Sequence, residues 1–429
     1  MNTIDRSRRP RVHDIGALTL APDTATVLPN GITLHIVNSG TSPVCRISVI
    51  LPGGRADSPR PQLLEMTASL LTQGTLETPG NRLSDILESH GAWSACGINQ
   101  QSTILNLYTL CSDYYALLPY VRQMAFTPSF EPEAVDRAKR AEITKLAVGE
   151  HRVTTRATYA IRPLIYTPGS NLAAVPTADS VAGFTPEMMR EIHGSRLDTS
   201  RTHIYIAGLV SPEMAEAAAR EFGTIDTGVT FTQTPVEFPT ITEPAETVVD
   251  MPEALQSCVK MAIQIPGYSS PDYASLRIAT CALGGYFGSR LMANIREDKG
   301  LTYGIGANLV ACPDKAYIIV TTQTDWANTG MVITETVSEI ERMKDPATYT
   351  PQEVERLSRS LLSSLAAVLD SPFTRADFLI SEMLGRASSF NYAVQEQAIR
   401  TATADSIASD AARWFDTSRL ITSIAGRRI

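Results

Sequence analysis

Arg296 and Tyr303 are the residues whose types and spacing best suit a chemical role. The sequence around them predicts that the arginine lies near the end of a helix and the tyrosine in the strand that follows. A guanidinium and a phenol both donate hydrogen bonds to a developing negative charge, and one such donor contributes about 3 kcal/mol in a closed site. The two side chains are therefore chemically suited to stabilise negative charge in a closed site. The plainer interpretation is an ion-paired helix end and a core aromatic ring.

The rest of the sequence offers few further catalytic groups. The histidines lack the spacing of metal ligands, and they are His13, His35, His90, His151, His193 and His203. The six cysteines include no C-x-x-C pair and predict buried free thiols. There is no G-x-S-x-G motif, which argues against a serine hydrolase. The glycine-rich segment 283–289 lacks the G-K-[ST] ending of a phosphate loop and predicts a tight turn between two helices.

Composition and charge exclude two classes of partner. The 429 residues carry a formal net charge of −8, whereas phosphate binding needs a positive footprint, so we expect no nucleic acid partner. No apolar run is long enough to span a bilayer, and the N-terminus lacks the apolar core of a secretion signal, so we expect no membrane partner and a cytoplasmic location. The basic stretch Arg6–Arg11 predicts a short solvated tail.

Paired segments indicate an internal duplication. Asp198–Gly208 (DTSRTHIYIAG) matches Asp416–Gly426 (DTSRLITSIAG), 218 positions later. Two further pairs follow at nearly the same offset, 46–53 with 260–267 and 130–146 with 349–365. Three matches in one order predict two copies of a domain of roughly 200 residues.

Each half has the same order of expected elements: a buried strand, two helices, two strands, longer helices and a closing strand. The Thr- and Pro-rich segment 226–244 predicts an extended linker. The expected organisation is a tail over 1–24, a domain over 25–225, the linker, and a second domain over 245–429. Sheets packed with helices, made twice, give an α/β (α+β) fold with two homologous domains.

The stretch 283–309, LGGYFGSRLMANIREDKGLTYGIGANL, carries a family likeness. It resembles the second domain of the insulinase/pitrilysin family of zinc peptidases, which includes the mitochondrial processing peptidases. There a helix leads to I-R-E or similar, then to G-L-(A/T)-Y and a strand. The first half is also similar, through LPNGITLHIVNSG near its start and LLTQGT further on. The resemblance covers residues 25–429 and implies the two-domain processing-peptidase fold, with mixed or antiparallel sheets.

The zinc motif of that family is degenerate here. In H-x-x-E-H the two histidines share a helix face and hold zinc, while the glutamate activates water. Counting back from LLTQGT, Glu65 and Ser69 stand at the histidine positions and Ala68 at the position of the base. Glu142 is the nearest candidate for the more distant glutamate ligand, although a threonine and a lysine align closer. We therefore expect no metal in this chain and zinc only in a partner.

The resemblance assigns roles to the residues that remain. It implies that Tyr303 donates to the scissile carbonyl and that Arg296 orients the substrate backbone, facing a zinc site on the opposite domain. We expect a zinc-free subunit of a heteromeric peptidase, inactive alone, with a homologous H-x-x-E-H chain as partner. Its substrate would be an unfolded peptide added to a sheet edge. The alternative is a catalytically inactive scaffold or peptide-binding protein, while an independent enzyme with another metal site is disfavoured by the histidines.

Overall fold

The computed structural model describes Ser7 and residues 13–427, so most of the basic stretch Arg6–Arg11 lies outside the described residues. The first half contributes six strands, β1 (Thr24–Val27), β2 (Thr33–Asn38), β3 (Val44–Pro52), β4 (Trp93–Ile98), β5 (Ser102–Leu110) and β6 (His203–Gly208). Its helices are α1 (Leu63–Leu70), α2 (Gly80–Ser89), α3 (Tyr114–Phe126), α4 (Pro132–Glu150), α5 (Val153–Ile165), α6 (Ala178–Ala182), α7 (Pro186–Gly194) and α8 (Pro212–Gly223).

The second half repeats this plan. Its strands are β7 (Ala245–Asp250), β8 (Gln256–Pro266), β9 (Thr302–Ala311), β10 (Lys315–Asp325) and β11 (Ile421–Gly426). Its helices are α9 (Tyr273–Gly284), the π-helical turn η3 (Met292–Asp298), α10 (Thr329–Arg342), α11 (Pro351–Ala367), α12 (Pro372–Gly385), α13 (Tyr392–Thr401) and α14 (Ala404–Trp414). None of the helices in the described residues is long and apolar enough to cross a bilayer.

Both sheets have the same topology, which accounts for the repeated sequence segments. The strand orders are β1-β2-β6-β3-β5-β4 and β7-β11-β8-β10-β9, so the second sheet matches the first without β1. The closing strands β6 and β11 each pair in parallel with one neighbour and antiparallel with the other. Before them, Asp198 and Asp416 each accept a hydrogen bond from the backbone N–H two residues on, at 3.0 Å in both cases. The fold prediction of two homologous mixed sheets packed with helices is confirmed.

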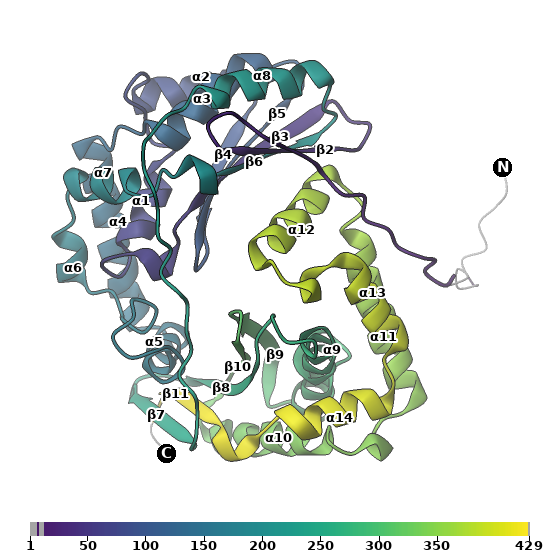
Figure 1. Cartoon of the computed structure of the whole chain (residues 1–429). Coiled ribbons are helices and arrows are strands. Elements are labelled where there is room, and N and C mark those ends of the chain that lie inside the picture. Colours follow the sequence, from purple (N-terminus) through teal and green to yellow (C-terminus); the bar gives the residue numbers. More distant parts are fainter. Residues whose placement is uncertain (1–6, 8–12, 428–429) are drawn as a thin grey trace.

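Two helices leave their own half and pack on the other sheet (Figure 1). Helix α5 from the first half lies against β11 and β8, where the Ser423 hydroxyl donates to the Ala157 carbonyl at 3.0 Å. Helix α12 from the second half covers β6 and β2, and Leu379 and Ile380 are buried there against Tyr205. The two halves are therefore joined by interlocking apolar contacts as well as by the chain between them.

The connecting segments are packed against the body of the molecule. Residues 224–244 contain no helix or strand, yet Val236 and Phe238 are buried against Tyr317 of the second sheet. The described part of the expected tail, residues 13–23, is also held in place. The Leu18 N–H donates to Glu396 at 2.9 Å, and Leu20 packs against both the second core and α12. This part of the segment is a strap across the second half, because its leucines and backbone find partners there.

Candidate functional site

Helix α1 carries the degenerate zinc-motif positions on an otherwise apolar segment, LLEMTASL. All of its residues except Glu65 and Ser69 are buried, so the i and i+4 positions form its one polar edge. The helix packs against β4, α4 and α7, all from the first half. The geometry matches the expectation that these two positions share one face, while their chemistry is that of a carboxylate and a hydroxyl.

The Glu65 carboxylate faces arginine side chains. Its Oε1 atom lies 3.3 Å from Nε of Arg55, and its Oε2 atom is buried without a hydrogen-bond partner. Burial raises the pKa of Glu65, an effect that the charges of Arg55 and Arg162 oppose and that of Glu142 reinforces. Glu142 itself is paired with Lys145 at 3.1 Å. The structure thus places Glu142 near Glu65, with guanidinium groups beside them.

This donor set does not fit a zinc ion. Ala68, at the position of the general base, is only 2% exposed and has no atom that accepts a proton. The Ser69 hydroxyl donates to the carbonyl of Met66 at 2.8 Å. Within the described part of the chain, no group of three or more His, Cys, Asp or Glu residues is arranged to hold a metal. Zinc needs several deprotonated ligands around one point, and here Glu65 instead pairs with a cation.

Arg296 lies on η3, in the second half. A π-helical turn is rare and is frequently found at functional sites. The guanidinium of Arg296 lies over the ring of Phe287, 5.1 Å from its centroid, and its ion pair with Glu297 is long, at 3.9 Å. The arginine is therefore partly exposed and only weakly held by a carboxylate.

Tyr303 lies on β9, the edge strand of the second sheet, and is 93% exposed. The register between β9 and β10 shifts at this point: Thr302 stands opposite Thr324 and Ile305 opposite Thr322, so Tyr303 and Gly304 together oppose one residue. Such a bulge re-aims side chains, and here Tyr303 and Gly304 are both exposed to solvent. The exposure rules out a core aromatic ring.

Threonine hydroxyls fix the shape of this bulge. Thr302 donates to the Gln323 carbonyl at 2.6 Å, Thr322 to that of Gly304 at 2.9 Å, and Thr324 to that of Leu301 at 2.6 Å. The turn between η3 and β9 uses Gly300 at φ +64°, a backbone conformation that disfavours other residues. The exposed tyrosine thus stands on a rigid segment.

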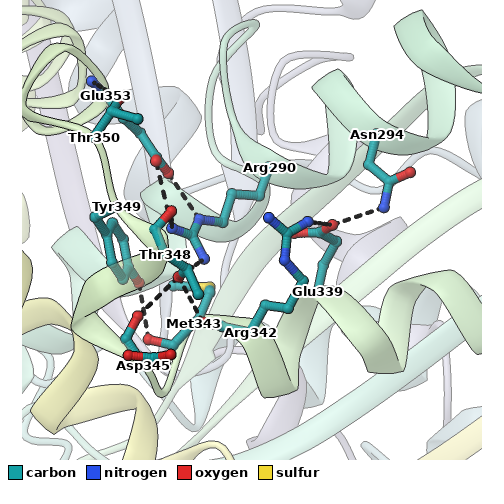
Figure 2. A network of polar contacts seen from close by, with 10 residues as sticks. All are labelled: Arg290, Asn294, Glu339, Arg342, Met343, Asp345, Thr348, Tyr349, Thr350 and Glu353. Atoms are coloured by element: carbon teal, nitrogen blue, oxygen red, sulfur yellow. Dashed lines mark hydrogen bonds and ion pairs between the residues drawn. The ribbon is translucent and has the colours of Figure 1, made fainter.

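A polar network anchors the helix that carries Arg296 (Figure 2). Arg290, 8% exposed, donates from Nε to Glu353 at 2.7 Å and from Nη1 to the hydroxyl of Thr348 at 3.0 Å. Its guanidinium also lies 3.7 Å from the ring centroid of Tyr349. These contacts join the start of the helix to α11 and to the turn before it.

A second set of contacts holds η3 itself. The buried Glu339 of α10 accepts from Asn294 and from Arg342, each at 2.7 Å, and Figure 2 shows its carboxylate between the two donors. Asn294 lies two residues before Arg296. Lys299, just after η3, pairs with Glu335 of α10. The chain therefore fixes η3 on both sides, which pre-positions the arginine.

The expected site residues fall into two separate groups. Glu65, Ala68 and Ser69 lie together on α1, whose partners belong to the first half. Arg296 and Tyr303 lie on η3 and β9, which contact each other in the second half. The main packing partners of these elements in the described chain belong to different halves.

One polar cluster escaped the sequence analysis. His35 hydrogen-bonds Asp23 through Nδ1, its Nε2 lies 3.0 Å from Nδ1 of His203, and its ring stacks on Tyr205. The parallel pairing of β2 with β6 brings these histidines together, although they are 168 positions apart. Spacing along the chain could not reveal this pair, because the signal lies only in the strand pairing.

Comparisons with known proteins agree with this architecture. Residues 183–361 match the family model described as Peptidase M16 inactive domain. A relative from Bacillus subtilis, "Uncharacterized zinc protease YmxG", is 22% identical over 353 residues, 80% of this chain and 83% of the relative.

Two solved structures have the same fold. A peptidase M16 inactive domain from Pseudomonas fluorescens superposes with a TM-score of 0.86 at 18% identity, over 95% of this chain and 98% of the other. The periplasmic protease PqqL from Escherichia coli gives 0.80 at 14% identity, over 97% of this chain and 47% of PqqL. The chain is therefore similar to the M16 peptidases: residues 183–361 match the inactive-domain model, and the fold is the one seen in these solved structures.

Proposed function

We propose that this chain is the zinc-free subunit of a two-chain peptidase. A homologous partner with H-x-x-E-H supplies zinc and the base, and this chain supplies Arg296 and Tyr303. The observation that carries the proposal is the full exposure of Tyr303 on a rigid bulge at a sheet edge. A tyrosine so exposed contributes little to its own core, so its value lies in what approaches it from outside.

The chemistry assigned to this chain is hydrogen bonding to a substrate. The phenol of Tyr303 donates to the scissile carbonyl oxygen as that oxygen gains negative charge. Arg296, with its weak ion pair to Glu297, has donors free to hold the substrate backbone. Because the networks around Asn294 and Arg290 fix the segment in advance, little reorganisation is needed when the substrate binds.

The size relation to PqqL supports a two-part enzyme. The chain covers 47% of that protease, so a protein of that length has room for two such units. A separate partner chain would supply the second unit here. For the location, we propose the cytoplasm, because the six cysteines are all free thiols, as is usual in a reducing compartment.

A second candidate function is a catalytically inactive scaffold or peptide-binding protein. It is favoured by the family match, since the inactive-domain segment 183–361 contains both Arg296 and Tyr303. In that case the same exposed residues would hold a peptide without cleaving it.

Co-purification separates the two functions. The tagged full chain would be recovered from its native organism, its companions identified by mass spectrometry, and zinc measured in the eluate. A near-stoichiometric companion with H-x-x-E-H and about one zinc per pair is expected. Recovery of this chain without zinc, alone or with unrelated proteins, would overturn the peptidase proposal and favour the scaffold.

A further inference from the structure

A cavity of about 670 Å³ lies between the two halves, and none of the functions above uses it. It is formed by the ends of β3 and β9, the turn between β4 and β5, and the C-terminal end of α12. Its volume falls in the range of small-molecule sites, which occur preferentially between domains. Its apolar wall includes Leu309, Leu384 and Phe390.

The polar wall of this cavity is cationic and rich in amides. It includes Asn99, Gln100, Gln101, Arg201, Gln233 and Arg386, and none of the lining residues is an aspartate or glutamate. This composition is unusual in a chain with a net charge of −8. A guanidinium pair without a facing carboxylate favours an anionic ligand, because each donor still has hydrogen-bonding capacity.

The two arginines are not neutralised by contacts across the cavity. Arg201 donates from Nη2 to the Gln233 side chain at 3.0 Å, and against the effect of burial its charge helps to lower the pKa of Asp198, which does not line the cavity. Among the described residues, the Arg386 side chain has no hydrogen bond or ion pair. The nearby carboxylates have other partners: Asp198 accepts from Ser200 and Phe231, and Glu382 accepts from Asn391.

Arg386 follows the last residue of α12 and lines the cavity. It occupies the left-handed conformation at φ +50°, which is uncommon for a residue other than glycine. Burial, followed by the charges of His35 and Arg386, lowers the pKa of His203 on the same wall to about 4. His203 is therefore neutral at pH 7 and adds a polar nitrogen without a charge, beside the two permanent cations.

We propose that this cavity binds a carboxylate group through Arg201 and Arg386, with the amides around them holding adjacent polar groups. The apolar wall admits a short hydrocarbon segment beside the charged end. Two sources share this chemistry: the C-terminal carboxylate of an unfolded peptide and a small organic acid. Binding of a peptide C-terminus depends on the proposed function in peptide handling. Binding of a carboxylate as such does not depend on that function.

Direct binding to the chain alone tests the site. A fluorescein-labelled, unstructured ten-residue peptide with a free C-terminal carboxylate would be compared with the same peptide as its C-terminal amide, by fluorescence polarisation. Succinate would compete in a third arm. The free carboxylate should bind about tenfold more tightly than the amide, as expected for charge-assisted hydrogen bonds. The preference should weaken as salt is raised.

Single variants assign the site to the cavity. Arg386→Gln and Arg201→Gln should each remove most of the preference for the free carboxylate. The matched control is Arg359→Gln, because Arg359 is an exposed arginine of α11 paired with Glu355 at 2.8 Å, away from the cavity. It should keep the wild-type preference. Thermal unfolding of each variant confirms that the fold is intact.

The outcomes separate the possible sources. Binding of succinate without any peptide preference supports the site and assigns it to a small organic acid. Equal binding of the free and amidated peptides together with no binding of succinate overturns the proposal, even if a zinc-bearing partner is found. Conversely, a preference for the free carboxylate when no zinc-bearing partner is found supports the carboxylate site. That combination contradicts only the two-chain peptidase proposal.

Discussion

The edges of the two sheets occupy equivalent places in the duplicated fold and have opposite chemical environments. β4 and β9 are each the last strand in the same strand order. Beside β4, helix α1 has a buried alanine and an arginine-paired glutamate where the family has a base and a ligand. On β9, Tyr303 stands fully exposed on a bulge.

This difference shows that the residues of a site can change while the fold around them stays the same. The frame depends on many apolar contacts, so replacing a few polar residues on α1 leaves it intact. The site depends on single side chains with defined positions. In the second half the network around η3 fixes the segment that carries Arg296, while in the first half Glu65 on α1 pairs with Arg55.

The largest expected effect comes from removing Arg290, which holds the helix that carries Arg296. Arg290→Leu leaves Glu353 without its buried partner, and breaking a buried pair costs about 3–5 kcal/mol. The free energy of unfolding, measured with urea, should fall by that amount. Arg359→Leu removes an exposed pair and should change it by less than about 1 kcal/mol. An equal decrease in the free energy of unfolding for both variants would show that the network around Arg290 stabilises the chain no more than an exposed ion pair does.

The second change tests whether the hydroxyl of the exposed Tyr303 takes part in catalysis. In the assembled pair, Tyr303→Phe should lower kcat by about 100-fold or more, since one oxyanion donor is lost, while assembly and stability stay unchanged. Tyr115→Phe, at another exposed tyrosine, is the matched control and should leave kcat unaltered. Full activity of the Tyr303→Phe pair would contradict the oxyanion role.

The third change restores the zinc-binding motif on α1, so that the first half also carries catalytic groups. The triple variant Glu65→His, Ala68→Glu and Ser69→His restores the motif but leaves the guanidinium of Arg55 facing it. Adding Arg55→Ala should raise zinc affinity by about tenfold or more, because surrounding groups tune metal sites by such factors. Zinc content and affinity would be measured by metal analysis and competition with a chelator. No zinc in either variant would show that the register on α1 is wrong.

The smallest expected effect concerns the titration of Glu65. Its pKa in the folded chain is raised above 4.5, mainly by burial, so the folded state binds its proton more tightly than the unfolded state does. Protonated Glu65 therefore stabilises the fold when the pH is below the pKa of this residue in the unfolded chain. That stabilisation is lost as the pH rises through its pKa in the folded chain. Relative to Glu65→Gln, the wild-type chain should therefore lose stability over that interval. Parallel urea curves at all pH values would contradict this.

The sequence determined much of the frame because its signals are local. The apolar strands near β3, β5 and β6 and the helices α1 and α8 follow from residue patterns within each segment. The duplicated segments around Asp198 and Asp416 fold alike, down to the same side-chain hydrogen bond. The loss of the zinc motif was also readable, because H-x-x-E-H is a short contiguous pattern.

Only the tertiary structure decided how the halves meet and what faces each site residue. The packing of α5 and α12 on the opposite sheets, the contact of His35 with His203 and the arginines beside Glu65 all join distant parts of the chain. The exposure of Tyr303 depends on a shift in strand register that no single segment encodes. Local patterns fix elements because they depend on neighbouring residues, whereas these contacts depend on the free energy of packing the whole chain.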